Sequence, residues 1–169
     1  MGYTTDFRGK FTLDHKLSEA QAAYLAKFSE TRRMRRNADI AATIADPIRE
    51  AVALPVGLEG GYFVAGAGFC GQDQDASCRY DDGDTNKPPA EQPGLWCQWV
   101  PTGDRRAIKW NGGEKFYGYV EWLKYIVRHF IKPWGYAMSG IVTWRGEDHS
   151  DIGAIVVINN RVTATRSQR

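Results

Sequence analysis

A chain of 169 residues with 43% hydrophobic residues has the size and composition of one globular domain, and its six Trp, eight Tyr and seven Phe can build a core without disulfides or a metal. The formal net charge of +2 is too small for the overall field to attract nucleic acid or a membrane, so any charge-based recognition must come from local clusters. No apolar run approaches the ~18 residues of a membrane span, and Met1–Asp6 has neither the basic nor the apolar part of a signal peptide. We therefore expect a cytoplasmic protein.

The first part of the chain predicts one strand followed by two helices. Residues 3–13 alternate between apolar and polar side chains, which indicates a half-buried strand. Ser18 is placed to cap a helix that we expect to cover residues 19–36. An Asp-Pro start signal predicts a short second helix within residues 46–55, and residues 62–64 have the composition of a short strand.

The second part predicts a long loop, one strong helix and five strands. Residues 66–94 are rich in Gly and Asp without periodicity, which is typical of a long loop. The expected elements that follow are a hairpin of residues 95–100 and 107–110, an amphipathic helix from residue 113 to 131, and strands at 136–145, 152–158 and 161–165. The order is β-α-α-β-β-β-α-β-β-β. Short links between consecutive strands make the sheet antiparallel, so we predict a single-domain α+β fold with helices packed on one face of the sheet.

Five segments carry a resemblance to a known group of proteins. They are MGYTTDF at residues 1–7, GLWCQWVP at 94–101, GEKFY at 113–117, VEWL at 120–123 and PWGY at 133–136. Together they resemble a group of small uncharacterised proteins encoded by bacteria and their phages, over nearly the whole chain. The resemblance implies an intracellular accessory protein of phage type and supplies no catalytic residue.

The sequence contains partial motifs for a metal ion and for a dinucleotide, but each lacks a required feature. We therefore expect neither a metal nor a cofactor. Cys70, Cys78 and Cys97 lack the close pairs of structural zinc sites, and reduced thiols are the simplest interpretation. Residues 73–84 imitate a calcium loop without its Gly and Glu. Residues 66–71 match G-x-G-x-x-G without the helix that dinucleotide binding requires.

Four arginines stand close together at the predicted end of the first helix: Arg32, Arg33, Arg35 and Arg36. Cations at a helix C-terminus suit the macrodipole and the last free carbonyls, so one interpretation is purely structural. Because four exceed that need, a second interpretation is recognition of phosphate or of an acidic partner by guanidinium groups. The sequence leaves both open.

A second candidate is the aromatic stripe of the long helix, formed by Trp122, Tyr125 and His129 at positions i, i+3 and i+7. Such a stripe is either a second packing face or the wall of a pocket or interface, where Trp and Tyr supply much of the binding energy.

From these features we hypothesise a non-catalytic protein that binds a small anionic ligand such as a nucleotide, or an acidic protein surface, through these arginines and the aromatic stripe. It would serve as an inhibitor or sequestering protein in host defence, with nucleic acid and membranes not expected as partners. A first alternative is an enzyme acting on a nucleotide or other phosphorylated substrate, with Glu147, Asp148 or His149 near Asp151 as acid and base. A second alternative is a structural protein that forms symmetric oligomers.

Overall fold

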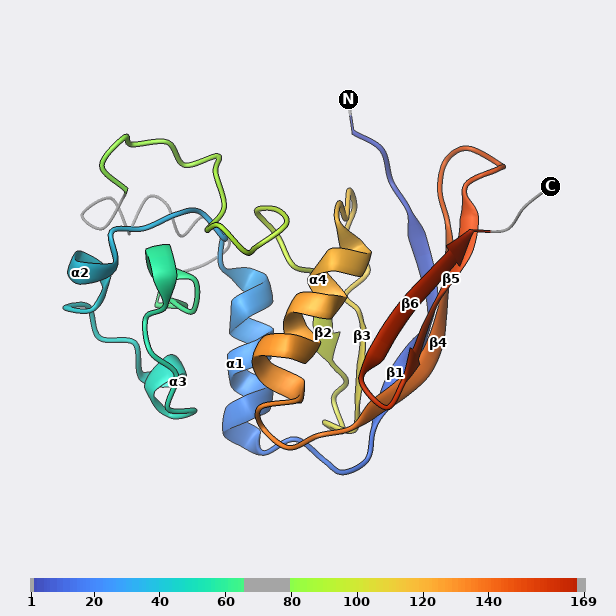
Figure 1. Cartoon of the computed structure of the whole chain (residues 1–169), viewed down its shortest axis with the longest axis horizontal. Coiled ribbons are helices and arrows are strands. Elements are labelled where there is room, and N and C mark those ends of the chain that lie inside the picture. The colour runs from blue at the N-terminus through green and yellow to red at the C-terminus, as the bar shows by residue number, and fades with distance from the viewer. Residues whose placement is uncertain (1, 66–79, 167–169) are drawn as a thin grey trace. The chain divides into compact units, whose positions relative to one another are not determined.

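The computed structural model describes residues 2–65 and 80–166, and over these residues the chain has the predicted α+β fold (Figure 1). Its internal contacts form two compact units. One unit, the sheet unit, consists of Met1–Leu17 and Gln98–Arg169, and the other, the helical unit, is Ser18–Cys97. Within the described residues, no helix has the length and apolar character needed to cross a bilayer.

The sheet unit contains six strands in the order β2-β3-β1-β4-β5-β6, with every neighbouring pair antiparallel. The strands are β1 Asp6–Leu13, β2 Trp99–Pro101, β3 Ala107–Trp110, β4 Met138–Arg145, β5 Ile152–Ile158 and β6 Arg161–Arg166. Although β1 comes first in the chain, it lies in the middle of the sheet between β3 and β4 (Figure 1). The central strand therefore has partners that are all distant in sequence.

One face of the sheet is covered by helix α4, Tyr119–Ile126, which continues as a π-helical turn over Val127–Ile131. The Tyr119 ring lies 4.9 Å from that of Phe7 and 5.4 Å from that of Trp144, measured between centroids. The indole Nε1 of Trp99 donates to the Tyr119 carbonyl at 2.8 Å. Aromatic side chains of four elements thus pack together in the core of the sheet unit, as the high aromatic content led us to expect.

The helical unit contains α1 Glu19–Glu30, α2 Ala38–Ala41, α3 Pro47–Glu50 and a short 3-10 turn at Leu58–Gly60. The predicted capping box of α1 is present, since Gln21 N donates to Ser18 Oγ at 3.1 Å and Ser18 N donates to Gln21 Oε1 at 3.2 Å. The predicted core residues of this helix, Tyr24, Leu25 and Phe28, are buried.

The prediction that the first helix reaches residue 36 is wrong, because α1 ends at Glu30. Thr31 has an extended backbone, with φ −104° and ψ 128°, and its hydroxyl donates to the Lys27 carbonyl. The next amides find partners outside the helix: those of Arg33, Arg35 and Arg36 donate to carbonyls of Leu95, Lys87 and Glu59. Distant loops thus satisfy these groups better than another helical turn would.

The strand predicted at residues 62–64 is also absent. Residues 62–64 form no strand, because the amides of Tyr62 and Phe63 donate to the adjacent turn at Val56 and Gly60, and that of Val64 donates to the carboxylate of Asp46.

The long helix begins at Tyr119 instead of residue 113, after Gly118 in the left-handed region at φ 66°. Of the predicted loop, residues 80–94 form turns without helix or strand, while residues 66–79, with Cys70 and Cys78, lie outside the described chain. Cys97 is buried and forms no disulfide within the described chain.

We predict that Gly153→Ala destabilises the sheet unit by about 1–3 kcal/mol, the usual effect of overpacking. Gly153 pairs with Trp144, and an added Cβ would overlap the ring of Trp144 and the carbonyl of Thr165. Gly103→Ala is the matched control, since a Cβ at that position meets no atom within 4 Å. Denaturant midpoints measure the difference, and equal midpoints for the two variants would contradict the proposed packing.

Candidate functional site

The four adjacent arginines lie on an extended segment of the helical unit, and two of them are fully buried. Arg33 has 0% exposure, and its guanidinium donates to the carbonyls of Phe63 at 2.9 Å and Gly61 at 2.8 Å. The same group stacks over the ring of Phe28, 4.1 Å from its centroid. Arg36, also 0% exposed, donates to carbonyls of its own segment. These two side chains stabilise the interior of the helical unit through hydrogen bonds to backbone carbonyls.

The other two arginines of the segment are partly buried and hold the loop of residues 80–94. Arg32 donates to the Thr85 carbonyl at 3.0 Å and to Asn86 Oδ1 at 2.7 Å. Arg35 forms ion pairs with Asp82 and with Glu59, the latter at 3.8 Å. The pKa of Asp82 is lowered, first by the hydrogen bond from the Asp84 amide and also by Arg35. The geometry of this segment therefore favours the structural interpretation of the run of arginines.

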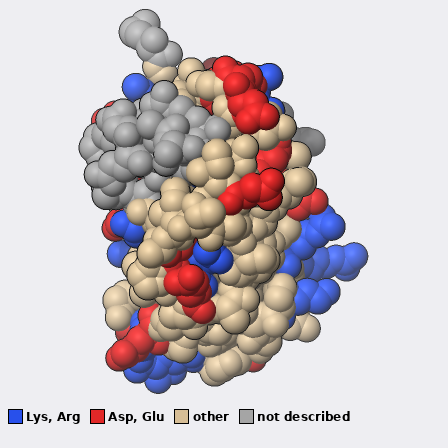
Figure 2. All heavy atoms as spheres, turned by 90° about the vertical axis from the view of Figure 1, so that its left-hand side faces the viewer, with Lys and Arg blue, Asp and Glu red and all other residues tan. Residues whose placement is uncertain are grey.

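The surface seen in Figure 2 agrees with this view. Over the middle of this face Lys and Arg are interspersed with Asp and Glu, and a group of basic side chains lies along its right-hand edge. Neighbouring charges of opposite sign weaken the local field that would attract an anion.

The aromatic stripe belongs to the sheet unit and is mostly buried. Trp122 is 0% exposed and Tyr125 is 8% exposed, while His129 is partly exposed. The rings of Tyr125 and His129 stack with centroids 4.1 Å apart, and Trp122 meets Tyr125 edge-on at 5.5 Å. Burial of this degree favours the packing interpretation.

The acidic cluster after β4 holds the N-terminal segment. Asp151 accepts hydrogen bonds from the Tyr3 hydroxyl at 2.8 Å and from the Trp144 indole at 3.1 Å. Glu147 Oε1 accepts from the Thr4 amide at 2.7 Å. Both carboxylates thus connect the start of β1 to the end of β4.

The rest of the cluster has local contacts. Asp148 Oδ1 accepts from the amide and the hydroxyl of Ser150, and His149 is exposed. The pKa of the Tyr3 phenol is raised: the Asp148 amide that donates to it lowers the pKa, but desolvation and the Asp151 carboxylate together raise it by more. Within the described residues, no group of three or more His, Cys, Asp or Glu side chains is arranged to hold a metal ion.

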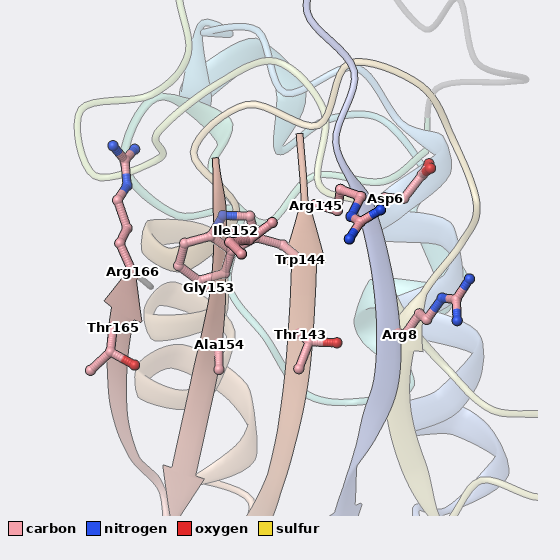
Figure 3. A pocket seen from close by; sticks show the side chains of 10 residues that line it. All are labelled: Asp6, Arg8, Thr143, Trp144, Arg145, Ile152, Gly153, Ala154, Thr165 and Arg166. Carbon is pink, nitrogen blue, oxygen red and sulfur yellow. The ribbon is translucent and has the colours of Figure 1, made fainter. Parts of the chain in front are cut away.

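A pocket of about 580 Å³ lies on the sheet face opposite α4, at the ends of β1, β4, β5 and β6. Figure 3 looks onto this face, with α4 behind the strands. The lining residues are Asp6, Arg8, Thr143, Trp144, Arg145, Ile152, Gly153, Ala154, Thr165 and Arg166. All belong to the sheet unit, so strand pairing alone assembles the site.

Strand register explains which side chains form the floor of the pocket. Arg8 pairs with Thr143, Thr143 with Ala154, and Ala154 with Thr165, so these four residues make one row across four strands. Directly paired residues of an antiparallel sheet project from the same face. The row therefore places a guanidinium at one end and two hydroxyl groups over a small apolar centre.

The charges of the pocket are unbalanced and exposed. Its three arginines and one aspartate sum to a formal charge of +2. Arg8, Arg145 and Arg166 are exposed, and over the described ranges none of them forms a side-chain hydrogen bond or an ion pair. Asp6 pairs with Arg145 in register without forming a salt bridge. The free guanidinium groups and nearby threonine hydroxyls are suited to binding an oxyanion.

Sequence reasoning missed this pocket because its cations are scattered along the chain. Alternation in residues 3–13 placed Asp6 and Arg8 on the polar side of a strand, which was the one available signal. Nothing in the sequence indicated that β4 would bring Arg145 to the same face as Arg8, or that β6 would end with Arg166 in the neighbouring row of Trp144 and Gly153.

Comparison with protein-family models, with curated proteins and with solved structures finds no match for this chain.

We predict that Arg33→Gln lowers the free energy of unfolding by at least about 2 kcal/mol, because it removes charge-assisted hydrogen bonds and leaves the buried Phe63 carbonyl without its donor, while the Gly61 carbonyl keeps the side-chain amide of Gln92. Arg32→Gln, in the same segment but partly exposed, should have the smaller effect. Urea unfolding followed by tryptophan fluorescence measures both changes. A larger loss for Arg32→Gln would show that the buried guanidinium is not what holds this segment.

Proposed function

We propose that this protein is a non-catalytic binder of a small anionic ligand, a nucleotide or another phosphorylated compound, and that the ligand binds in the pocket on the open face of the sheet. The observation that carries the proposal is the pair of exposed arginines on the open face, Arg8 and Arg145, which line the pocket without a carboxylate partner in the described chain. The third arginine of the lining, Arg166, comes from the neighbouring row of Gly153 and Trp144. Like charges gathered at one place repel each other, and a bound anion relieves that repulsion.

The dimensions and chemistry of the pocket support a small ligand. A volume of about 580 Å³ falls within the ~300–1,000 Å³ of small-molecule sites. Thr143 and Thr165 supply hydroxyl donors, and Ile152 and Ala154 supply a limited apolar surface. Guanidinium groups bind phosphate in a bidentate manner, so a phosphorylated ligand fits this set of donors best.

Binding without turnover is favoured by the acid-base groups present. Among the described residues, the lining contains neither His nor Cys, and Asp6 is its one carboxylate. General acid-base catalysis generally needs a positioned proton donor or acceptor close to the reacting group. The carboxylates of Glu147 and Asp151, the basis of the enzyme alternative, already hold the N-terminal segment.

The biological setting that we propose rests on the resemblance to small phage-type proteins. A cytoplasmic protein of this kind would withhold its ligand from other proteins, as an inhibitor or sequestering protein in host defence. The resemblance supports this biological role, whereas the pocket supports the ligand class.

The proposal predicts that pyrophosphate or ATP at millimolar concentration stabilises the protein in a thermal shift assay. A ligand at 100 times its dissociation constant adds about 2.7 kcal/mol to the stability of the folded state. The double variant Arg8→Gln/Arg145→Gln should keep the melting temperature of the free protein, because these exposed side chains lack partners in the described chain. It should lose at least about tenfold in affinity, as two guanidinium contacts disappear.

The matched control is Lys124→Gln/Lys132→Gln, which removes the same charge from exposed positions of the same unit outside the pocket. Its affinity should remain within about threefold of the unmodified protein, since charges beyond a Debye length are screened. Equal losses in the two double variants, or no stabilisation of the unmodified protein by either anion, would contradict the proposed site.

A further inference from the structure

We infer that the open face of the sheet, beside the pocket, docks one amphipathic helix of a partner protein, with an apolar stripe flanked by Asp and Glu. The residues that carry this inference lie outside the lining of the pocket, so it goes beyond the proposed function and does not depend on it.

The centre of this surface is an apolar patch of Ile141, Val156 and Ile158. Ile141 on β4 pairs with Val156 on β5, and Ile158 lies two residues further along β5, so all three project from one face. Their neighbours Val142 and Val157 are buried, which places the patch on the face opposite the core. Ile141 is 58% exposed and Ile158 is 68% exposed. Exposed apolar side chains that lie together, unlike single ones, are typical of an interaction site.

Cations border the apolar patch on both sides. Lys10 on β1 pairs with Ile141, and Arg161 on β6 pairs with Ile158. Both cations are exposed, and within the described chain neither forms a salt bridge or a side-chain hydrogen bond. Their charges are therefore available to carboxylates of a partner that covers the patch.

The distance between the two bordering strands fits one helix. The strand order is β1-β4-β5-β6, so β1 and β6 are separated by three spacings of ~4.8 Å, or about 14 Å. Figure 3 shows these four strands side by side, seen from the open face. An α-helix with its side chains is about 10–12 Å across. A helix that runs along the strands can thus bury its apolar stripe on the patch and bring flanking carboxylates to Lys10 and Arg161.

The charge of the open face determines the sign of the partner. Five exposed cations project from the described strand positions of this face: Arg8, Lys10, Lys109, Arg145 and Arg161. Asp6 is the one carboxylate among these positions, so the face sums to +4, whereas the whole chain has a net charge of +2. The pKa of Asp104, in the turn before β3, is lowered first by the hydrogen bond from Thr102 and in part by Lys10. Counting this neighbouring carboxylate, the surface still has an excess of positive charge.

The same features disfavour two other occupants. A second copy of this chain would bring two positive faces together, and like charges across an interface oppose association. Nucleic acid would find no aromatic ring on which to stack its bases, because the described strand positions of this face include no Phe, Tyr or Trp. The exposed isoleucines instead fit the apolar stripe of a helix.

The test is fluorescence anisotropy with the full chain and a fluorescein-labelled synthetic peptide of about 18 residues, with leucines at helical spacing and glutamates beside them. We expect a dissociation constant below about 100 µM at physiological ionic strength. The same peptide with lysine in place of glutamate, or with a central proline that breaks the helix, should bind at least about tenfold more weakly.

Three outcomes of these titrations would refute the inference. They are no binding of the acidic peptide, equal binding of its lysine form, and tighter binding of a DNA duplex or of phosphatidylserine vesicles than of the acidic peptide. If pyrophosphate stabilises the protein and the acidic peptide does not bind, this inference fails while the proposed function stands.

A matched pair of substitutions tests the apolar patch. Ile158→Thr keeps a β-branched side chain in the strand and should weaken binding of the acidic peptide about five- to tenfold. Leu58→Thr removes an apolar side chain of similar exposure, 71%, from the helical unit and should leave this affinity unchanged. Because Ile158 lies outside the pocket lining, stabilisation by pyrophosphate should be the same in both variants. Equal peptide affinities of the two variants would contradict docking on the patch.

A second pair tests the bordering cations. Lys10→Gln/Arg161→Gln should weaken the acidic peptide by at least about tenfold, because both rows of ion pairs disappear. Lys124→Gln/Lys132→Gln removes the same charge from exposed positions of the same unit outside this face, and should change the affinity less than about threefold. Equal losses in the two double variants would show general attraction to a basic protein and refute the inference.

Discussion

The pairing of β1 with β4 is the constraint on which the fold of the sheet unit and its pocket both depend. Eight consecutive residues pair, from Asp6 with Arg145 to Leu13 with Met138. Since side chains alternate between the faces of a strand, a shift by one residue would exchange the buried and exposed sets completely. Gly9 stabilises this register: its φ is 111°, and a Cβ there would collide with the carbonyl of Ile141. The same register that buries Phe7 under α4 therefore presents Arg8 to solvent.

Local signals in the sequence were sufficient to locate an element where the interactions that determine its position are also local. Alternation located β1, and a side-chain cap located the start of α1. The end of α1 could not be found in this way, because the carbonyls that compete for the amides of Arg33 and Arg36 come from Leu95 and Glu59, far along the chain. The pocket was unpredictable for the same reason: its members lie together only because of strand order, which a single sequence does not specify.

The contrast between the two groups of arginines shows that charge density along a chain differs from charge density in space. The consecutive arginines look like a binding site in the sequence, yet Arg33 and Arg36 are buried and donate to backbone carbonyls. Burying a guanidinium is tolerable only when hydrogen bonds replace its hydration, so these side chains are committed to structure. Arg145 and Arg166 are isolated in the sequence, and both remain exposed in the fold. Exposure and the lack of partners, not adjacency in sequence, make a cation available to a ligand.

The two faces of β4 serve the core and the pocket separately. Trp144 faces α4 and contributes to the core, whereas the neighbouring Arg145 faces the pocket. Because alternation places these two side chains on opposite faces, the ring of Trp144 is used inside the protein. The outward positions beside it are occupied by Thr143 and Ala154, which offer hydroxyl and methyl groups only. The strand order that builds the core therefore also leaves guanidinium, hydroxyl and methyl groups on the open face of the sheet.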